Sequence, residues 1–448
     1  MHGFSQKECN MIQDKVEKYI RKHNLLSPES RVLIGVSGGA DSVALLLLLK
    51  NMGFHVVAAH CNFHLRGDES IRDELFVENL CRVHDVEYIK TDFDTKAVAQ
   101  QRGISIEMAA RDLRYAFFDE ARMQHACSAV AVAHHQDDNV ETILLNLMRG
   151  TGIKGLCGIQ PKKGFVIRPF LCLRRDEITA WLDSIGQHYV TDSTNLIPDV
   201  ERNKVRLQLI PLLRQMKTSS IGNILRASEN LQETRLVYDA AISSYINLCL
   251  TPDGCHIKKD VLLSSPSPLS ILHELLSPLG FNRSQLTDLV HSFNHIGSSF
   301  ESATHVLVVG RNCLELESKE ELERLRTREI AVEDIISLET ADRANPVAFD
   351  PSPSVAYFDA DKLKGHLQVR LARKGDQIVP FGMKGRKLVS DLLTDLKISS
   401  LAKQKQLVLL SGDTIAWVIG RRTSDLFRVD DTTRRMIIAR VKKNQSDL

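Results

Sequence analysis

The sequence lacks several features that would place the protein in particular classes. None of its nine cysteines forms a C-x-x-C pair, and the closest two, Cys249 and Cys255, are six positions apart. This spacing argues against a structural zinc site and against a redox dithiol. An odd, scattered set of cysteines without a secretory signal is typical of a reducing compartment, so we expect a cytoplasmic protein. The longest apolar run, Val43–Leu49, is too short to cross a bilayer, so we expect no membrane segment.

Glutamate is absent from the last part of the chain. From Val355 to Leu448 there are 19 Lys and Arg residues, 10 Asp and no Glu, although the whole chain has a net charge of only +2. A basic segment on a more acidic body predicts contact with a polyanion. The alternative is a solvated basic surface without a partner.

The first part of the chain alternates short β-rich runs with helical segments. Strands are predicted at Val32–Val36, His55–His60, Glu87–Lys90 and Ala129–Ala133, and helices at Asp41–Lys50, Asp68–His84 and Ile106–Met123. This alternation predicts an α/β fold with a doubly wound parallel sheet. Ligands of such sheets bind beyond the carboxyl ends of the strands.

The rest of the chain has a different pattern. Apolar residues at helical spacing predict one long helix over Arg226–Cys249, and His305–Glu317 is predicted to be a hairpin. Alternating apolar side chains near the end predict strands. At 448 residues two or three domains are expected. We predict an α/β domain at 1–215, a mainly helical middle domain with a charged linker at 216–350, and a small basic β-rich domain at 351–448.

The first predicted strand runs into a short loop that contains no lysine. Residues Ser37 to Ser42 read Ser-Gly-Gly-Ala-Asp-Ser, where a strand turns into a helix. Backbone N–H groups at a helix start bind anions, and Gly38 and Gly39 let a phosphate approach the backbone closely. Loops of the G-x-x-x-x-G-K-[ST] type place a lysine on the β- and γ-phosphates. A loop without lysine suits a pyrophosphate that is held and then released.

The complete Ser-Gly-Gly-x-Asp-Ser string resembles the loop of the N-type ATP pyrophosphatases. The members of that group adenylate an oxygen atom and displace AMP with a nucleophile. Four further stretches are together similar to the signature of the tRNA(Ile)-lysidine synthetase family; they are His60–Ser70, Glu107–Phe118, Ala133–Leu156 and Asp192–Leu213. Near the end of the chain, Arg373–Leu393 resembles the C-terminal domain of the same family.

This resemblance implies a specific reaction. ATP adenylates O2 of the wobble cytidine in the CAU anticodon of one isoleucine tRNA, and the ε-amine of L-lysine then displaces AMP from C2. It also implies ATP and Mg²⁺ as cofactors, with tRNA(Ile) and L-lysine as partners. The tRNA thiolases of the same group are the nearest alternative, but they need a C-x-x-C pair, an iron–sulfur cluster or a catalytic cysteine. A tRNA-binding protein with an inactive body is another alternative, and a homodimer stays open.

The candidate site residues fall into groups by expected role. The ATP-binding residues are Ser37, Gly38, Gly39, Ala40, Asp41 and Ser42, and Asp41 and Asp138 are also expected to hold the metal. The candidate catalytic residues are Asp41, Arg111 and Asp138, and Asp137 and Glu141 are expected to bind lysine. Contacts with tRNA are expected from Arg114, Arg202, Arg206, Lys384, Arg386 and Lys387.

The carboxylates and arginines also admit simpler interpretations. Carboxylates clustered at Asp137, Asp138 and Glu141 are unfavourable unless a cation lies among them, but the two aspartates could merely cap a helix. Arg111 and Arg114 share one helix face, which suits phosphates or the charge that develops during adenylation. The alternative for Arg111 is an ion pair with a glutamate one turn earlier.

Two further groups remain open at this level. Arg202 and Arg206 share a predicted helix face, and they could meet the tRNA backbone or be ordinary surface charges. His60, Cys61 and His64 lack a fourth ligand nearby, which favours a structural role over a metal site. The resemblance of this stretch to the family implies instead a position at the nucleotide or cytidine pocket.

Overall fold

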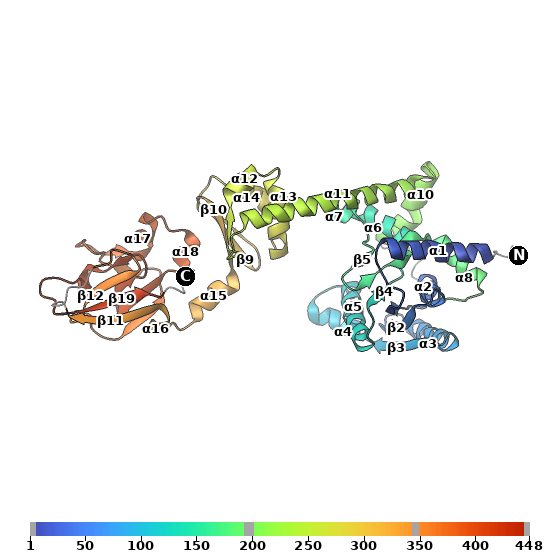
Figure 1. Ribbon diagram of the computed structural model, residues 1–448, viewed down its shortest axis with the longest axis horizontal. Coiled ribbons are helices and arrows are strands. Elements are labelled where there is room, and N and C mark those ends of the chain that lie inside the picture. The colour runs from blue at the N-terminus through green and yellow to red at the C-terminus, as the bar shows by residue number, and fades with distance from the viewer. Residues whose placement is uncertain (1–5, 192–200, 343–348, 443–448) are drawn as a thin grey trace. The chain divides into compact units, whose positions relative to one another are not determined.

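The structure, a computed structural model, describes residues 6–191, 201–342 and 349–442, with the backbone alone for residues 6–10. The first nine residues of the stretch that begins at Asp192 therefore lie outside the described part. The chain divides into two compact units between Val237 and Tyr238, and each unit is described by itself (Figure 1). Within the described ranges, no helix is both long enough and apolar enough to cross a membrane.

A six-stranded sheet in the order β3-β2-β1-β4-β6-β5 forms the centre of the first unit (Figure 1). Its strands are β1 (Arg31–Gly35), β2 (His55–Asn62), β3 (Glu87–Asp92), β4 (Ala129–Ala131), β5 (Lys162–Lys163) and β6 (Val166–Ile167). All neighbouring pairs are parallel except β5 with β6. The chain order reverses between β1 and β4, so ligands are expected at the carboxyl ends of these two strands.

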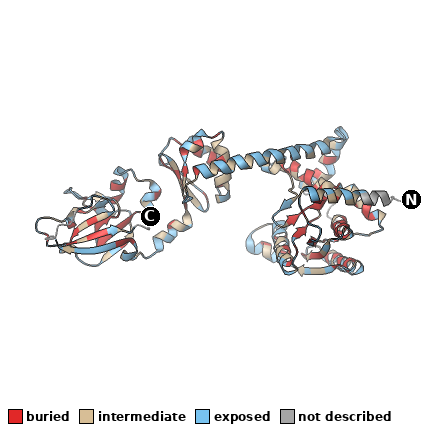
Figure 2. Ribbon diagram, in the orientation of Figure 1, coloured by how far each residue is buried: buried red, intermediate tan, exposed pale blue. Residues whose placement is uncertain are grey.

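Helices cover both faces of this sheet, which confirms the predicted doubly wound α/β fold. The helices are α1 (Gln6–Lys22), α2 (Ala40–Asn51), α3 (Asp68–Val83), α4 (Thr95–Arg102), α5 (Ile106–Gln124), α6 (Gln136–Met148), α7 (Ile153–Leu156), α8 (Arg175–Ser184), α9 (Glu201–Lys204) and α10 (Ile210–Met216). Val32 and Ile34 of β1 pack with α1, α2, α3 and α8, whereas Leu33 packs with Phe118 of α5 on the other face. Because side chains alternate along a strand, the residues of β1 pack into two cores, one on each face of the sheet. Figure 2 shows the strands of this sheet as largely buried.

The middle of the chain combines helices with a small antiparallel sheet. The helix α11 (Ser220–Cys249) contains the boundary between the two units and covers the predicted Arg226–Cys249 helix. The elements that follow are β7 (His256–Lys258), α12 (Lys259–Ser264), α13 (Pro268–Leu276), α14 (Arg283–His291), β8 (Ser299–Glu301), β9 (His305–Val309), β10 (Cys313–Ser318) and α15 (Lys319–Thr327). Antiparallel pairing of β9 with β10 confirms the predicted hairpin.

The end of the chain is rich in antiparallel strands, as predicted. Its elements are α16 (Val332–Ile335), β11 (Ile336–Asp342), β12 (Val355–Asp359), β13 (Leu367–Leu371), β14 (Gln377–Ile378), β15 (Lys387–Leu388), α17 (Val389–Asp395), α18 (Ser400–Gln404), β16 (Leu407–Ser411), β17 (Thr414–Val418), β18 (Arg422–Thr423) and β19 (Arg435–Val441). The strand β11 pairs with β19 along its whole length. The segment expected to be linker before residue 351 therefore contributes a strand to the C-terminal sheets.

Candidate functional site

The loop from Ser37 to Ser42 connects β1 to α2 at the switch point of the sheet. Gly38 has a φ of +89°, and Gly39 is the N-cap residue of α2, with no side chain of its own to cap the helix. The Ser42 hydroxyl accepts from the Ser37 N–H at 3.1 Å and donates to the Gly39 carbonyl at 3.0 Å. A parallel bridge brings Val190 to the loop, and its N–H donates to the Gly38 carbonyl at 2.9 Å. The backbone N–H groups at the start of α2 are thus available to bind an anion.

We expect Gly38→Ala and Gly39→Ala to weaken ATP binding for different reasons. The positive φ of Gly38 is unfavourable for alanine by roughly 1–2 kcal/mol, so this variant should lose loop stability as well as ATP affinity. Gly39 has an ordinary φ of −72°, and a Cβ there would meet nothing closer than Ser37 Oγ at 3.6 Å. Gly39→Ala should therefore keep the melting temperature and still raise the KM for ATP. Unchanged kinetics in Gly39→Ala would mean that no phosphate approaches this residue.

A cavity of about 330 Å³ opens beside the loop. Gly39 and Asp41 line its polar end, and Phe63, Tyr115 and Phe118 contribute aromatic walls. An apolar cavity with polar groups at one end suits a nucleoside whose phosphates reach the loop. Cys61 also lines this cavity, but burial raises the pKa of its thiol to about 12. This thiol stays protonated at neutral pH, so it is poorly suited to persulfide chemistry.

An acidic cluster, formed by Asp41, Asp137, Asp138 and Glu141, lies next to the loop. Asp41 is in the first turn of α2, and the other three lie in the first two turns of α6. The buried ring of His135 lies among them, with Nε2 3.3 Å from Asp138 Oδ2 and 3.8 Å from Asp41 Oδ2, and Nδ1 3.7 Å from Asp137 Oδ2. The tertiary structure therefore brings together all four carboxylates that the sequence selected.

The two aspartates expected to hold the metal have opposite electrostatic surroundings. Burial raises the pKa of Asp41, although the nearby His135 opposes this, and its buried Oδ1 has no hydrogen-bond partner among the described residues. For Asp138 burial also acts to raise the pKa, but the charge and backbone N–H of His135, together with Arg202, lower it overall. Asp138 also accepts from the His135 N–H at 3.0 Å, so the helix-capping interpretation is correct for this residue.

Three arginines supply cations to this acidic cluster. Arg202 and Arg206 both bond to Glu141, with Nε–O distances of 2.8 and 2.6 Å, and both also reach Asp138 Oδ1. The Glu141 side chain is fully buried, so these contacts offset the cost of burying its charge. Arg214 donates to Asp137 at 2.8 Å. Arg202 and Arg206 are therefore not ordinary surface charges, although their contact with tRNA stays a prediction.

A π-helical turn over Val205–Leu209 follows α9 in the segment that carries Arg202 and Arg206. The two arginines are four residues apart, which places them on one face, and they converge on one carboxylate. Such π-helical turns often occur at functional sites. The segment from residue 201 thus belongs to the site, although it lies more than 60 positions after Glu141 in the chain.

Several residues that the sequence did not single out also line the site. Arg66 and Arg175 line a cavity of about 680 Å³ with Asp41, Asp138 and Arg206. His135 was visible in the stretch from Ala133 to Leu156, but nothing in the spacing showed that its ring lies among three carboxylates. Arg66 lies within the signature stretch His60–Ser70, but it was given no role there.

The arginines of α5 lie where phosphates or a base could meet them. The Arg111 guanidinium lies 5.1 Å from the centre of the Tyr115 ring, and that of Arg114 lies 5.2 Å from the centre of the Phe63 ring. Arg114 lines both the nucleoside cavity and the larger cavity with Asp138. Stacking on aromatic rings holds both guanidinium groups without neutralising them.

The metal-binding potential of the site depends on few protein ligands. Among the residues that the structure describes, no group of three or more His, Cys, Asp or Glu side chains is arranged to hold a metal. His60 instead contacts the Val36 carbonyl at 2.8 Å, and His64 contacts Asp92. Mg²⁺ that arrives with phosphates needs only one or two carboxylates from the protein. The unpartnered Oδ1 of Asp41 fits that requirement.

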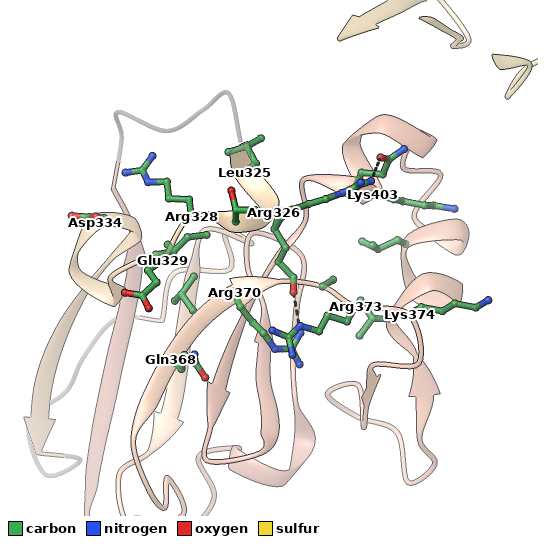
Figure 3. Close-up of a pocket in the computed structure, with 18 of the residues that line it drawn as sticks. Leu325, Arg326, Arg328, Glu329, Asp334, Gln368, Arg370, Arg373, Lys374 and Lys403 are labelled. Carbon is green, nitrogen blue, oxygen red and sulfur yellow. Dashed lines mark hydrogen bonds between the residues drawn. The ribbon is translucent and has the colours of Figure 1, made fainter. Parts of the chain in front are cut away.

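A basic groove of about 1180 Å³ lies in the second unit (Figure 3). Arg328 lies on one side of this groove, with Lys374 and Lys403 on the other and Arg370 and Arg373 between them. Arg370 forms a double hydrogen bond with Asp376 at 2.7 and 3.0 Å. The groove therefore contains one arginine, Arg370, that is fixed by an ion pair, and further basic side chains along its sides.

The tail residues expected to meet tRNA lie elsewhere. Lys384 and Arg386 are exposed in the turn between β14 and β15, and Lys387 pairs with Asp395. None of the three lines the basic groove. The end of the chain thus has two separate basic surfaces, of which the sequence indicated only one.

Comparisons with known proteins match most of the chain. The family descriptions that match are a PP-loop domain over residues 9–213, a TilS substrate binding domain over 251–319 and a TilS substrate C-terminal domain over 367–439. The tRNA(Ile)-lysidine synthase of Bacteroides thetaiotaomicron is 44% identical over 438 residues, which cover 96% of this chain and 100% of that protein. The tRNA(Ile)-lysidine synthase of Parabacteroides distasonis is 42% identical, with 94% and 98% covered.

Among solved structures, the U34-tRNA thiolase NcsA from Methanococcus maripaludis is similar at 17% identity and a TM-score of 0.43. The similarity covers 51% of this chain and 82% of that one. A likeness at this level has no bearing on the chemistry.

Proposed function

This chain belongs to the tRNA(Ile)-lysidine synthase family, and on that basis we propose how its residues divide the work of the reaction. The enzyme ligates L-lysine to C2 of the wobble cytidine in the CAU anticodon of tRNA(Ile). It uses ATP and passes through an adenylated cytidine, with release of pyrophosphate and then AMP. The observation that carries our assignment is the position of Asp41, which belongs both to the phosphate-binding loop and to the acidic cluster around His135.

The first half-reaction takes place at the loop. The nucleoside of ATP occupies the cavity lined by Phe63, Tyr115 and Phe118, and the phosphates lie on the start of α2. Asp41 and Asp138 would hold Mg²⁺, which neutralises phosphate charge when bound. The cytidine O2 attacks the α-phosphorus, the bond to the bridging oxygen breaks, and pyrophosphate leaves. Arg114 and Arg111 stabilise the negative charge that develops on the phosphoryl oxygens.

The second half-reaction needs a site for the lysine ammonium group. Asp137 accepts a proton from the ε-ammonium, and the free amine attacks C2. The C2–O bond breaks, AMP leaves with the bonding electrons, and the proton released from the new C–N nitrogen passes to solvent. We assign the ammonium to Asp137, because its partner Arg214 is half-exposed and can move aside. The sequence also assigned Glu141 to lysine. In the structure, Arg202 and Arg206 occupy both of its carboxylate oxygens, so we propose that Glu141 orients these arginines instead.

The direct test of this function uses one reaction mixture. The full chain is incubated with ATP, labelled lysine and a tRNA(Ile) transcript with a CAU anticodon, and the digested RNA is analysed by mass spectrometry. We expect a cytidine that carries lysine, with one AMP released per product. A base that carries sulfur, or AMP release without lysine transfer, would contradict the proposal.

We propose that the basic groove contacts tRNA. We expect Arg373→Glu with Lys374→Glu to raise the KM for tRNA by about tenfold. The affinity for tRNA should also depend less steeply on salt, because a protein that contacts fewer phosphates releases fewer counterions when it binds. The KM for ATP should not change. The comparison variant carries Lys384→Glu with Arg386→Glu. A larger effect in this second variant would locate the main contact at the turn between β14 and β15.

Two other assignments also remain proposals. We place the enzyme in the cytoplasm, where its tRNA substrate is found, and fluorescence of a tagged chain measures this. The homodimer that the sequence left open is measured by light scattering of the purified chain.

A further inference from the structure

A pocket of about 260 Å³, which we call the arginine pocket, lies beside the acidic cluster. Two of its arginines, Arg111 and Arg202, have roles in the assignments above, but the space itself has been given no ligand. Four arginines line it, namely Arg111, Arg149, Arg168 and Arg202. The other described residues that line it are His134, Thr142, Leu145, Asn146 and Ile159. No carboxylate is among these lining residues. Arg149 pairs with Glu201 and Arg202 with Glu141 outside the pocket, so its positive charge comes mainly from Arg111 and Arg168. Such a concentration of charge favours an anionic ligand.

Arg168 is the buried centre of this pocket. It follows β6, and only 7% of its surface is exposed. One terminal nitrogen donates to the Gln160 carbonyl at 2.9 Å, whereas the buried Nε has no hydrogen-bond partner among the described residues. Burial lowers the pKa of Arg168, so its charge is destabilised as it stands. A buried, charged donor without a partner is unfavourable, and a bound anion would satisfy it.

His134 connects the arginine pocket to the nucleoside cavity. It follows β4 and lines both spaces. Its buried Nδ1 also lacks a partner within the described part of the chain. Burial lowers the pKa of His134 to about 4, so the ring is neutral at physiological pH. A ligand in the arginine pocket therefore lies one side chain away from the nucleoside cavity.

We propose that the arginine pocket binds a phosphodiester of the tRNA backbone that flanks the wobble cytidine. This inference rests on the proposed function and adds the subsite that holds the RNA strand during adenylation. Arg168 would use its free Nε as one half of a bidentate contact with the phosphate. The cytidine would then extend past His134 toward the α-phosphate of ATP.

The observations favour an RNA phosphate over the other anions of the reaction. The pyrophosphate already has its own site at the start of α2. Lysine would bring two ammonium groups into a pocket with four arginines and no carboxylate. At about 260 Å³ the pocket is also smaller than typical whole-ligand pockets of roughly 300–1,000 Å³, so it suits a phosphate with part of its sugar. At the rim, the side chain of Arg149 is 63% exposed, which leaves a path for the continuing strand.

The test uses the full chain and full-length tRNA(Ile) assembled by ligation, with one neutral methylphosphonate at a chosen position. The phosphates on the 5′ and 3′ sides of the wobble cytidine are replaced in turn, and a methylphosphonate elsewhere in the anticodon loop is the control RNA. We expect one flanking substitution to lower kcat/KM by about 10- to 100-fold in the wild type, as loss of a charged hydrogen bond predicts. The KM for ATP should not change.

The same RNAs identify the protein partner of that phosphate. In Arg168→Met the sensitive methylphosphonate should change kcat/KM by less than about twofold, because the contact is already lost. Arg102→Met, on α4 and outside the pocket, should retain the full loss. Arg111→Gln alters an exposed helix face, and it replaces Arg168→Met if the latter does not fold. In Arg111→Gln the sensitive methylphosphonate should lower kcat/KM by a smaller factor than in the wild type.

Each outcome decides the inference. If both flanking methylphosphonates behave like the control RNA, no phosphate beside the cytidine is bound and the inference is wrong. If the loss persists in full in Arg168→Met, or in Arg111→Gln where Arg168→Met does not fold, the phosphate binds elsewhere and the inference is also wrong. Formation of lysidine by the wild type on unmodified tRNA keeps the proposed function intact in either case. Failure of that control reaction would instead overturn the function itself.

Discussion

Asp41→Asn should lower AMP release in the presence of tRNA and lysine by about 100- to 1,000-fold. The substitution keeps the size of the side chain but removes the carboxylate that faces the phosphates, and losses of this order follow removal of a group that stabilises transferring charge. A coupled assay for AMP, run at saturating ATP, measures the effect.

The stability of Asp41→Asn should not fall with its activity. Because burial raises the pKa of Asp41 in the folded state, ionisation favours the unfolded chain at every pH above its unfolded pKa. The neutral amide removes this penalty, so the free energy of unfolding at pH 7 should stay the same or rise. A variant that melts early would indicate a structural role, and near-normal turnover would contradict our assignment. Asp14→Asn on α1 is the matched control, with both properties unchanged.

Glu141→Ala should have the largest effect on stability. It removes the fully buried carboxylate that bonds to Arg202 and Arg206, and breaking a buried ion pair from one side typically costs about 3–5 kcal/mol. Both arginines are partly exposed, so we expect the lower end, about 3 kcal/mol. For a unit of this size that lowers the melting temperature by roughly 6–12 °C. Calorimetry of the full chain measures the transition of the first unit.

A double substitution separates the lost contact from the arginines left without it. Glu141→Ala combined with Arg206→Ala removes one of the arginines that would otherwise be left unpaired. The loss of unfolding free energy in the double variant should therefore be smaller than the sum of the losses in the two single variants. Additive losses would mean that the Glu141–Arg206 contact contributes little. Activity should be low in all three variants, because Arg206 also reaches Asp138 and lines the larger cavity with Asp41.

Local patterns in the sequence were sufficient for the framework. The β-rich runs around Val32 and Val57 and the helical segments between them predicted the parallel sheet, because backbone periodicity is set within a few residues. The Ser-Gly-Gly-Ala-Asp-Ser string predicted a phosphate loop at a helix start. Motif spacing also selected Asp137, Asp138 and Glu141, since residues one turn apart on a helix share a face.

Contacts between distant segments were beyond that kind of reasoning. Nothing in the sequence showed that Val190 closes the loop at Gly38, or that Arg202 and Arg206 neutralise Glu141. The basic groove and the strand β11 were missed for the same reason, since each depends on pairing across many positions.

The sequence by itself therefore determined which chemical groups this protein has and on which helix or loop each one lies. Only the tertiary structure decided which of them meet. It placed the neutral His134 between the nucleoside cavity and the arginine pocket, and it buried Arg168 with an unsatisfied donor. The physical reason is that hydrogen bonding and periodicity act locally along the chain. Burial and charge pairing depend on distances in space, which the fold alone determines.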